Sequence, residues 1–296
     1  MTWNKKYWNI IEELYWVPSY IGLQSIPRKH WDVQDDVVSV PRHMTHPKGP
    51  LYRRVYSGQA YWDFIKKKEE TFNHIFDLAL AIAPGDVIAE LFGALIGATD
   101  LHPYEVQGHD IRDRYAWIGG ANVTTPDAFL ICPTAILAIE LKFDAKTSTD
   151  QLSKYVALIA GEELLNGRRD AIELLYIFPS DAESKFAKQT GIHPRRLDAS
   201  AFSEMRNGTK NKRVQLFFDE APDAVKSVLD RLHISCITWQ ELSDRITNYS
   251  DTIDNTTGGR TLKRLLDGLR DAIQSHPLSR VSSHGPPKRR PPTEDG

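Results

Sequence analysis

The sequence predicts an α/β fold with a mixed central sheet flanked by helices. Two observations lead to this fold class. Apolar runs typical of buried strands alternate with helical patterns along the second half of the chain, as in α/β proteins. In addition, only the short turn Cys132-Pro133-Thr134-Ala135 separates two such runs, 128–131 and 136–142, which predicts a β-hairpin and therefore an antiparallel pair in the sheet.

The first part of the chain does not follow this alternation. Residues 1–62 hold five of the seven tryptophans among prolines and histidines, with no sustained period, and we expect an irregular, partly helical, aromatic-rich extension there. From 63 to 82 apolar residues recur at roughly helical spacing, and Ala83-Pro84-Gly85 ends the pattern. A second helix is expected at 86–98 and a strand at 115–118.

Beyond the hairpin, strands and helices alternate up to the last helical pattern. We expect strands at 171–178, 214–218 and 234–238, and helices at 149–165, 221–232, 241–249 and 261–273. Residues 275–296 are rich in proline, serine and basic residues and lack an apolar pattern, which predicts a disordered tail. The chain is thus divided into an extension (1–62), one α/β domain (63–274) and a tail (275–296).

The composition excludes several classes of protein. A content of 41% hydrophobic and 26% charged residues fits a globular protein rather than a collagen, a coiled coil or a wholly disordered chain. The formal net charge of −2 gives no chain-wide basic surface, so a nucleic-acid partner would need a local positive surface aided by metal ions. Two cysteines without a CxxC pair favour a reducing cytoplasm, and we expect neither a signal peptide nor a membrane span.

The hairpin places charged residues at the end of an apolar strand. A turn centred on 133–134 sets Asp127 across from Glu140, and such like charges repel unless a cation, typically a hard divalent ion, lies between them. Lys142 falls on the same face as Glu140, whereas Leu141 points to the opposite face. Two acids and one ammonium on one surface are suited to hydrolysing a phosphodiester. The alternative is an ordinary surface pair that binds nothing.

These residues resemble the signature motifs of the PD-(D/E)xK nuclease superfamily, with Pro126-Asp127 and Glu140-Leu141-Lys142 in the same order and spacing. Gln151 and Tyr155 further resemble the QxxxY motif of its RecB-type branches. The resemblance covers roughly residues 86–180. It implies a restriction-endonuclease-like core and a nuclease acting on DNA, with RNA less favoured. It also implies Mg²⁺, for which Mn²⁺ substitutes, held by Asp127, Glu140 and the backbone carbonyl of Leu141, with Lys142 catalytic.

Members of this superfamily often add one more acid from the first core helix, and Glu90 is the candidate for that catalytic and metal-binding role. It interrupts the apolar pattern of 87–92. Because a buried unpaired carboxylate is costly, Glu90 is expected either to face the metal ion or to reach solvent. The alternative is a plain solvent-facing glutamate. Asp86, Glu105 and Asp110 remain competitors.

Gln151 and Tyr155 lie four residues apart, so they share a helix face and are candidates to contact a phosphate backbone or a base. The alternative is that Gln151 belongs to a capping box with Ser148 and that Tyr155 packs in the core. Lys146 and Lys154 flank this helix and are candidate phosphate contacts, although solvated lysines are the ordinary case.

Other interpretations stay open at this point. The basic stretch 206–213 is expected to be a loop before a strand, and it is more often solvated than functional. A catalytically inactive nuclease-like module that binds nucleic acid or protein is the main rival, and a homodimer or a partner protein could use the N-terminal region. The sequence does not decide between endo and exo cleavage, between single and double strands, or among biological processes.

Overall fold

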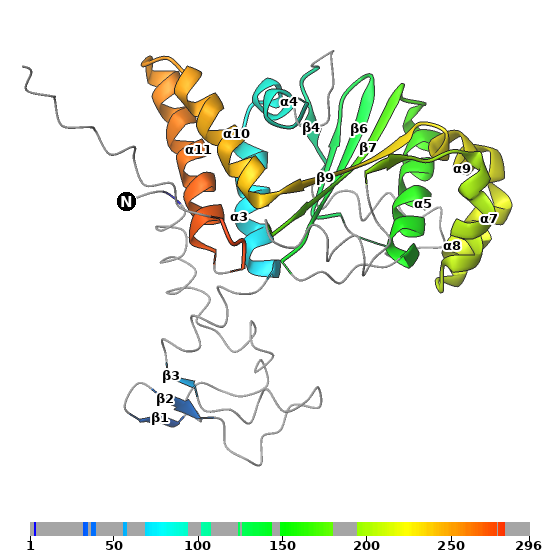
Figure 1. Ribbon diagram of the computed structural model, residues 1–296, viewed down its shortest axis with the longest axis horizontal. Coiled ribbons are helices and arrows are strands. Elements are labelled where there is room, and N and C mark those ends of the chain that lie inside the picture. The colour runs from blue at the N-terminus through cyan, green and yellow to red at the C-terminus, as the bar shows by residue number, and fades with distance from the viewer. Residues whose placement is uncertain are drawn as a thin grey trace, which may run out of the picture.

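The computed structural model describes Trp3, residues 32–34, 37–39, 56–57, 69–93, 102–107, 124, 126–143, 149–179, 194–276 and 278–281. Its main feature is an α/β arrangement around an open six-stranded mixed sheet, which confirms the predicted fold class at this level (Figure 1). The strand order is β4-β5-β6-β7-β9-β8, in which β6, β7 and β9 are parallel and the other pairs are antiparallel. The strands are β4 (Glu105–Val106), β5 (Ala128–Ile131), β6 (Ala135–Leu141), β7 (Ala171–Phe178), β8 (Arg195–Arg196) and β9 (Leu232–Thr238).

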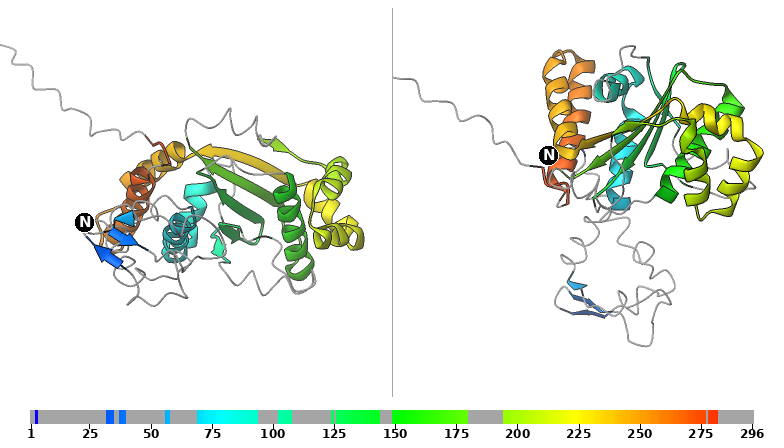
Figure 2. Two further views of the ribbon diagram at one scale, coloured as in Figure 1. Left: turned by 90° about the horizontal axis from the view of Figure 1, so that it is seen from below. Right: turned by 45° about the vertical axis from the view of Figure 1, so that its right-hand side comes forward.

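Helices cover both faces of the sheet, so the described part of the domain has three layers (Figure 2). One face packs against α5 (Thr149–Asn166), α7 (Phe202–Gly208), α8 (Lys212–Glu220) and α9 (Pro222–Leu229), with a 3₁₀ turn at Ala199–Ala201. The other face packs against α3 (Glu69–Ile82), α4 (Gly85–Gly93), α10 (Trp239–Thr252) and α11 (Thr257–Ser275). No helix of the described residues is long and apolar enough to span a membrane.

The central strand β6 shows how the sequence divides the core. Successive side chains of a strand point to opposite faces. Ile136 and Ala138 therefore pack with the α5 group of helices, whereas Leu137 and Ile139 pack with the α4 group. Both faces are buried, which is why this strand is a nearly continuous apolar run. The first polar residue of the strand, Glu140, continues the alternation and faces α5.

The hairpin has the predicted register. Ala128 pairs with Ile139, and the pairing continues to Ile131 opposite Ile136 next to the turn. The same register extended by one residue sets Asp127 opposite Glu140, where β5 begins and β6 ends. The pairing was predictable because the turn is short and both strands are apolar.

The segment predicted as a strand at 214–218 is instead the helix α8, and that prediction was wrong. Its valine and phenylalanines favour a strand by composition, but the buried residues Val214, Phe217 and Phe218 follow helical spacing. Asn211 caps the helix, because its side chain accepts hydrogen bonds from the backbone N–H groups of residues 213 and 214. The exposed Leu216 lies on the outer face of α8.

Some residues near the two ends of the chain are also described. The predicted irregular extension includes a small antiparallel sheet of β1 (Asp32–Gln34), β2 (Val37–Ser39) and β3 (Tyr56–Ser57). The indole N–H of Trp3 donates to the Leu265 carbonyl on α11 at 2.8 Å. The first residues of the predicted disordered tail are ordered, since Ser279 is buried and donates to the Ile273 carbonyl at 2.7 Å. The predicted strand at 115–118 lies outside the described residues.

Candidate active site

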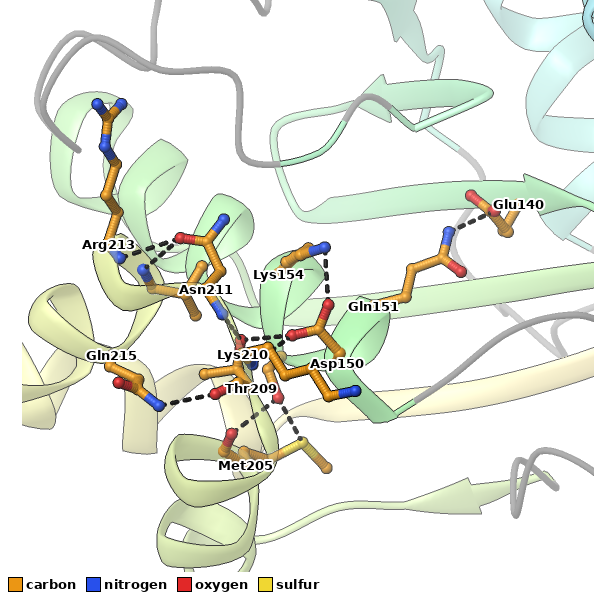
Figure 3. Close-up of polar contacts among 12 residues, drawn as sticks. Glu140, Asp150, Gln151, Lys154, Met205, Thr209, Lys210, Asn211, Arg213 and Gln215 are labelled. Carbon is orange, nitrogen blue, oxygen red and sulfur yellow. Dashed lines mark hydrogen bonds and ion pairs between the residues drawn. The ribbon is translucent and has the colours of Figure 1, made fainter. Parts of the chain in front are cut away.

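Glu140 is the centre of a buried polar cluster at the end of β6. The residue is only 4% exposed. The Lys142 ammonium forms an ion pair with one carboxylate oxygen, and the Tyr155 hydroxyl donates to the other. The Gln151 side-chain amide donates to Glu140 at 2.5 Å, as Figure 3 shows. Three residues that the sequence nominated separately therefore converge on one carboxylate.

Asp127 lies beside this cluster at the entrance to β5. One of its carboxylate oxygens accepts from the Leu141 backbone N–H at 2.7 Å. The other accepts from the Asn73 amide on α3 at 2.5 Å. The negative charges of Glu140 and Asp127 both act on the Tyr155 hydroxyl. Asp127 and Glu140 thus both lie near Tyr155, and Asp127 is also within reach of α3 from the other side of the sheet.

Tyr155 is held in its protonated form by its surroundings. Burial is the largest cause, and the negative charges of Glu140 and Asp127 add to it, so the pKa of Tyr155 lies well above its usual range. The phenol stays a hydrogen-bond donor to Glu140 at neutral pH. Tyr155 is 0% exposed, so it acts on this carboxylate rather than touching a substrate. The substrate contact expected of Tyr155 is thus replaced by a structural contact to Glu140.

The Gln151 side chain, like that of Tyr155, points to the Glu140 carboxylate. Its amide reaches Glu140, so it adds a donor to the carboxylate on the helix face that it shares with Tyr155. The capping partner considered for Gln151, Ser148, lies outside the described residues, and so does the candidate phosphate contact Lys146. Lys154 forms an ion pair with Asp150 one turn earlier in α5 at 2.8 Å. Lys154 thus has an acidic partner within its own helix.

Glu90 lies apart from this cluster, contrary to the role predicted for it. The helix α4 packs Val87, Ile88 and Leu91 against the sheet face opposite to Glu140. The Glu90 side chain is 47% exposed and lies 3.8 Å from the guanidinium of Arg245 on α10. The described residues contain no group of three or more histidines, cysteines or acids able to hold a metal ion, so no third acid joins Asp127 and Glu140.

The oxygen atoms of Asp127, Glu140 and the Leu141 carbonyl are nevertheless the kind of ligand that suits a hard divalent ion. Asp127 and Glu140 supply carboxylate oxygens, which Mg²⁺ prefers. The N–H of Leu141 points to Asp127, and in a β-strand the carbonyl of the same residue points to the same edge. These three residues would hold Mg²⁺ or Mn²⁺. Lys142 offsets part of their negative charge from the same face.

Sequence reasoning missed three residues that shape this site. Asn73 fixes Asp127 from α3, a helix far away along the chain. Tyr176 is the partner of Glu140 in the parallel pair of β6 and β7, and its hydroxyl lies within electrostatic reach of Tyr155. The indole N–H of Trp239 donates to the Lys142 carbonyl at 3.1 Å and so fixes the end of β6. Of these three residues, only Tyr176 could have been predicted from the sequence, because it places a polar group within a run of apolar strand residues.

No known family model, curated protein sequence or solved structure matches this chain.

Proposed function

We propose that this chain is a metal-dependent nuclease of the PD-(D/E)xK type, hydrolysing phosphodiester bonds of DNA, with RNA as the less favoured substrate. The observation that supports this function best is the arrangement at the end of β6, where Lys142, Gln151 and Tyr155 all contact Glu140 and Asp127 accepts a hydrogen bond from the Leu141 backbone N–H. Asp127 directly precedes β5, Glu140 and Lys142 lie at the end of β6 and just beyond it, and Gln151 and Tyr155 lie on α5.

Each residue of the cluster has a chemical task in this proposal. Asp127, Glu140 and the Leu141 carbonyl would hold Mg²⁺, and a divalent ion bound there supplies water activation and polarisation of the scissile phosphate. Lys142 keeps a positive charge where the phosphate becomes more negative during the reaction. Its burial strengthens this effect, because charges interact more strongly where water is excluded.

Tyr155 and Gln151 serve as positioning residues in this proposal. Both donate to Glu140, and neither side chain carries charge when it does so. Two donors and one cation fix the direction of the carboxylate before a substrate arrives. Such supporting hydrogen bonds around a metal-binding carboxylate orient the ligand and tune its affinity for the metal.

One observation favours the rival function, a nuclease-like module that binds without cutting. Glu140 already has Lys142, Gln151 and Tyr155 as partners, so a purely structural polar network would also satisfy this buried carboxylate. The two functions differ in a measurable way, since only the enzyme loses an activity when Glu140 or Lys142 is replaced.

The test is a cleavage assay on plasmid DNA, single-stranded DNA and RNA, each with Mg²⁺, with Mn²⁺ and with EDTA. The parent should cut in a metal-dependent way, and Glu140→Gln and Lys142→Ala should lose cutting but keep binding. Glu220→Gln on the exposed end of α8 is the matched control and should cut like the parent. Binding without cutting by the parent would support the inactive module instead.

A further inference from the structure

Residues 206–213 carry four cations, and three of them have no acidic partner among the described residues. Arg206 is neutralised by Asp219, to which it donates two hydrogen bonds of 2.7 Å. Lys210, Lys212 and Arg213 are exposed and form no ion pair with a described carboxylate. We call these three residues the basic turn. It lies in the connection between α7 and α8 and in the first two residues of α8, whereas the sequence predicts a loop before a strand.

The basic turn is fixed to the start of α5. Asp150 accepts hydrogen bonds from the Thr209 hydroxyl at 2.8 Å and from the Lys210 backbone N–H at 2.7 Å. Thr209 is only 2% exposed, and its carbonyl accepts from the Gln215 side chain at 2.7 Å. The backbone that carries the three cations is therefore held in place before any partner arrives, which lowers the entropy that binding would cost.

The same turn of α5 also supports the candidate active site. Asp150 holds the basic turn, and the next residue, Gln151, donates to Glu140 at 2.5 Å. Figure 3 shows the two sets of contacts on either side of this helix start, with Lys154 beside Asp150. The basic turn and Glu140 thus belong to one continuous structural unit on the same face of the sheet.

The charges of the basic turn do not serve the stability of α8. Lys212 and Arg213 are the first two residues of this helix, and its first turn contains no acid. Cations are unfavourable at a helix N-terminus, because the helix dipole places partial positive charge there. A cluster of cations that forms no ion pair with the described carboxylates, on a chain of net charge −2, is instead complementary to a polyanion.

We propose that the basic turn binds the phosphate backbone of the nucleic acid whose phosphodiester lies at Glu140. The inference rests on the proposed function and adds the surface that holds the strand beyond the cutting site. Lysine and arginine contacts to phosphates are independent of base sequence, and they weaken as salt rises because binding releases counterions.

The experiment measures binding of labelled single-stranded and duplex DNA by fluorescence anisotropy in EDTA, so that no strand is cut. The test variant is Lys210→Ala, Lys212→Ala and Arg213→Ala together. The matched control removes three cations from α11, on the opposite face of the sheet: Arg260→Ala, Lys263→Ala and Arg264→Ala. Both variants change the net charge equally, and thermal unfolding checks that both are folded.

The test variant should bind at least tenfold more weakly than the control at about 0.1 M salt. Its slope of log affinity against log salt should fall in magnitude by about 2.7 for a duplex or about 2.1 for a single strand, because each phosphate contact contributes about 0.9 or about 0.7. Equal affinity and slope in the two variants would overturn the proposal, as would a parent that binds no DNA. Binding of labelled poly-glutamate as tightly as DNA would overturn nucleic acid as the partner.

A parallel cleavage assay separates this inference from the proposed function. If the test variant cuts and binds DNA like the parent, the proposed nuclease function stands and the basic turn has no part in binding DNA. DNA binding that depends on the basic turn, in a parent that never cuts, would support the inference and refute the enzyme.

Discussion

Replacing Tyr155 by phenylalanine tests the polar cluster with the change of a single atom. The side chain is fully buried among apolar residues, so phenylalanine fills the same space and leaves no cavity in the surrounding core. The lost hydroxyl donates to Glu140, which is itself buried. Hydrogen bonds to charged groups contribute about 1.5–3 kcal/mol, and we expect the free energy of unfolding to fall by this amount.

Equilibrium unfolding in urea measures this loss, and a double-mutant cycle with Glu140→Gln assigns it to the contact. We expect a coupling energy of roughly 1 kcal/mol or more between the two sites. Tyr104→Phe is the control, because Tyr104 is also buried but packs on the other face of the sheet, and it should not couple to Glu140. In the cleavage assay Tyr155→Phe should lower the rate about 10–100-fold, as is typical of residues that orient a metal ligand. A change in stability below about 0.5 kcal/mol, or equal coupling of Tyr104 to Glu140, would contradict a stabilising hydrogen bond between Tyr155 and Glu140.

Three further predictions follow from other parts of the structure. A methyl group at Gly268 on α11 would overlap the Trp3 indole, whereas at Gly258 it would meet no atom within 4 Å. We therefore expect Gly268→Ala to unfold at lower urea than Gly258→Ala, by about 1–3 kcal/mol in stability, and equal stabilities would contradict the docking of Trp3. Burial disfavours the charged form of Asp150, but its hydrogen bonds to Lys154, the Lys210 N–H and Thr209 outweigh burial, so its pKa lies below the ordinary value of 3.8. The charged form of Asp150 then stabilises the fold above that value, and this stabilisation is lost as the pH falls through the lowered pKa. Asp150→Asn should therefore be less stable than the parent at pH 7, and the difference in stability should vanish in acid. A difference that does not change with pH would contradict the stabilising role of the Asp150 carboxylate. Finally, Glu90→Gln should cut DNA at the parent's rate, because Glu90 lies on the face opposite to Glu140, and loss of activity would restore it to the metal site.

The sequence was sufficient to predict the parts of the fold that depend on local rules. The hairpin register follows from a short turn between two apolar strands, and the pairing of Ala128 with Ile139 agrees with it. The spacing of Gln151 and Tyr155 also predicted that both would lie on one helix face. These inferences hold because neighbouring residues in the chain decide them.

The remaining features depend on how distant segments pack. Helix α8 was mistaken for a strand because valine and phenylalanine suit both structures, and only the burial of Val214, Phe217 and Phe218 shows the helical period. Glu90 was assigned to the metal site without knowledge of which sheet face α4 covers. The contact between Asn73 and Asp127 joins residues that are 54 positions apart, and no local sequence pattern predicts it.

The proposed nuclease depends on a binding site for a divalent ion formed by Asp127 and Glu140. Calorimetric titration of the purified chain with Mn²⁺ tests it most directly, with Asp127→Asn and Glu140→Gln as the variants and Glu220→Gln as the control. We expect one saturable Mn²⁺ site in the parent and the control, and at least about tenfold weaker binding in both variants. No saturable binding by the parent, or equal affinity in all four proteins, would contradict it.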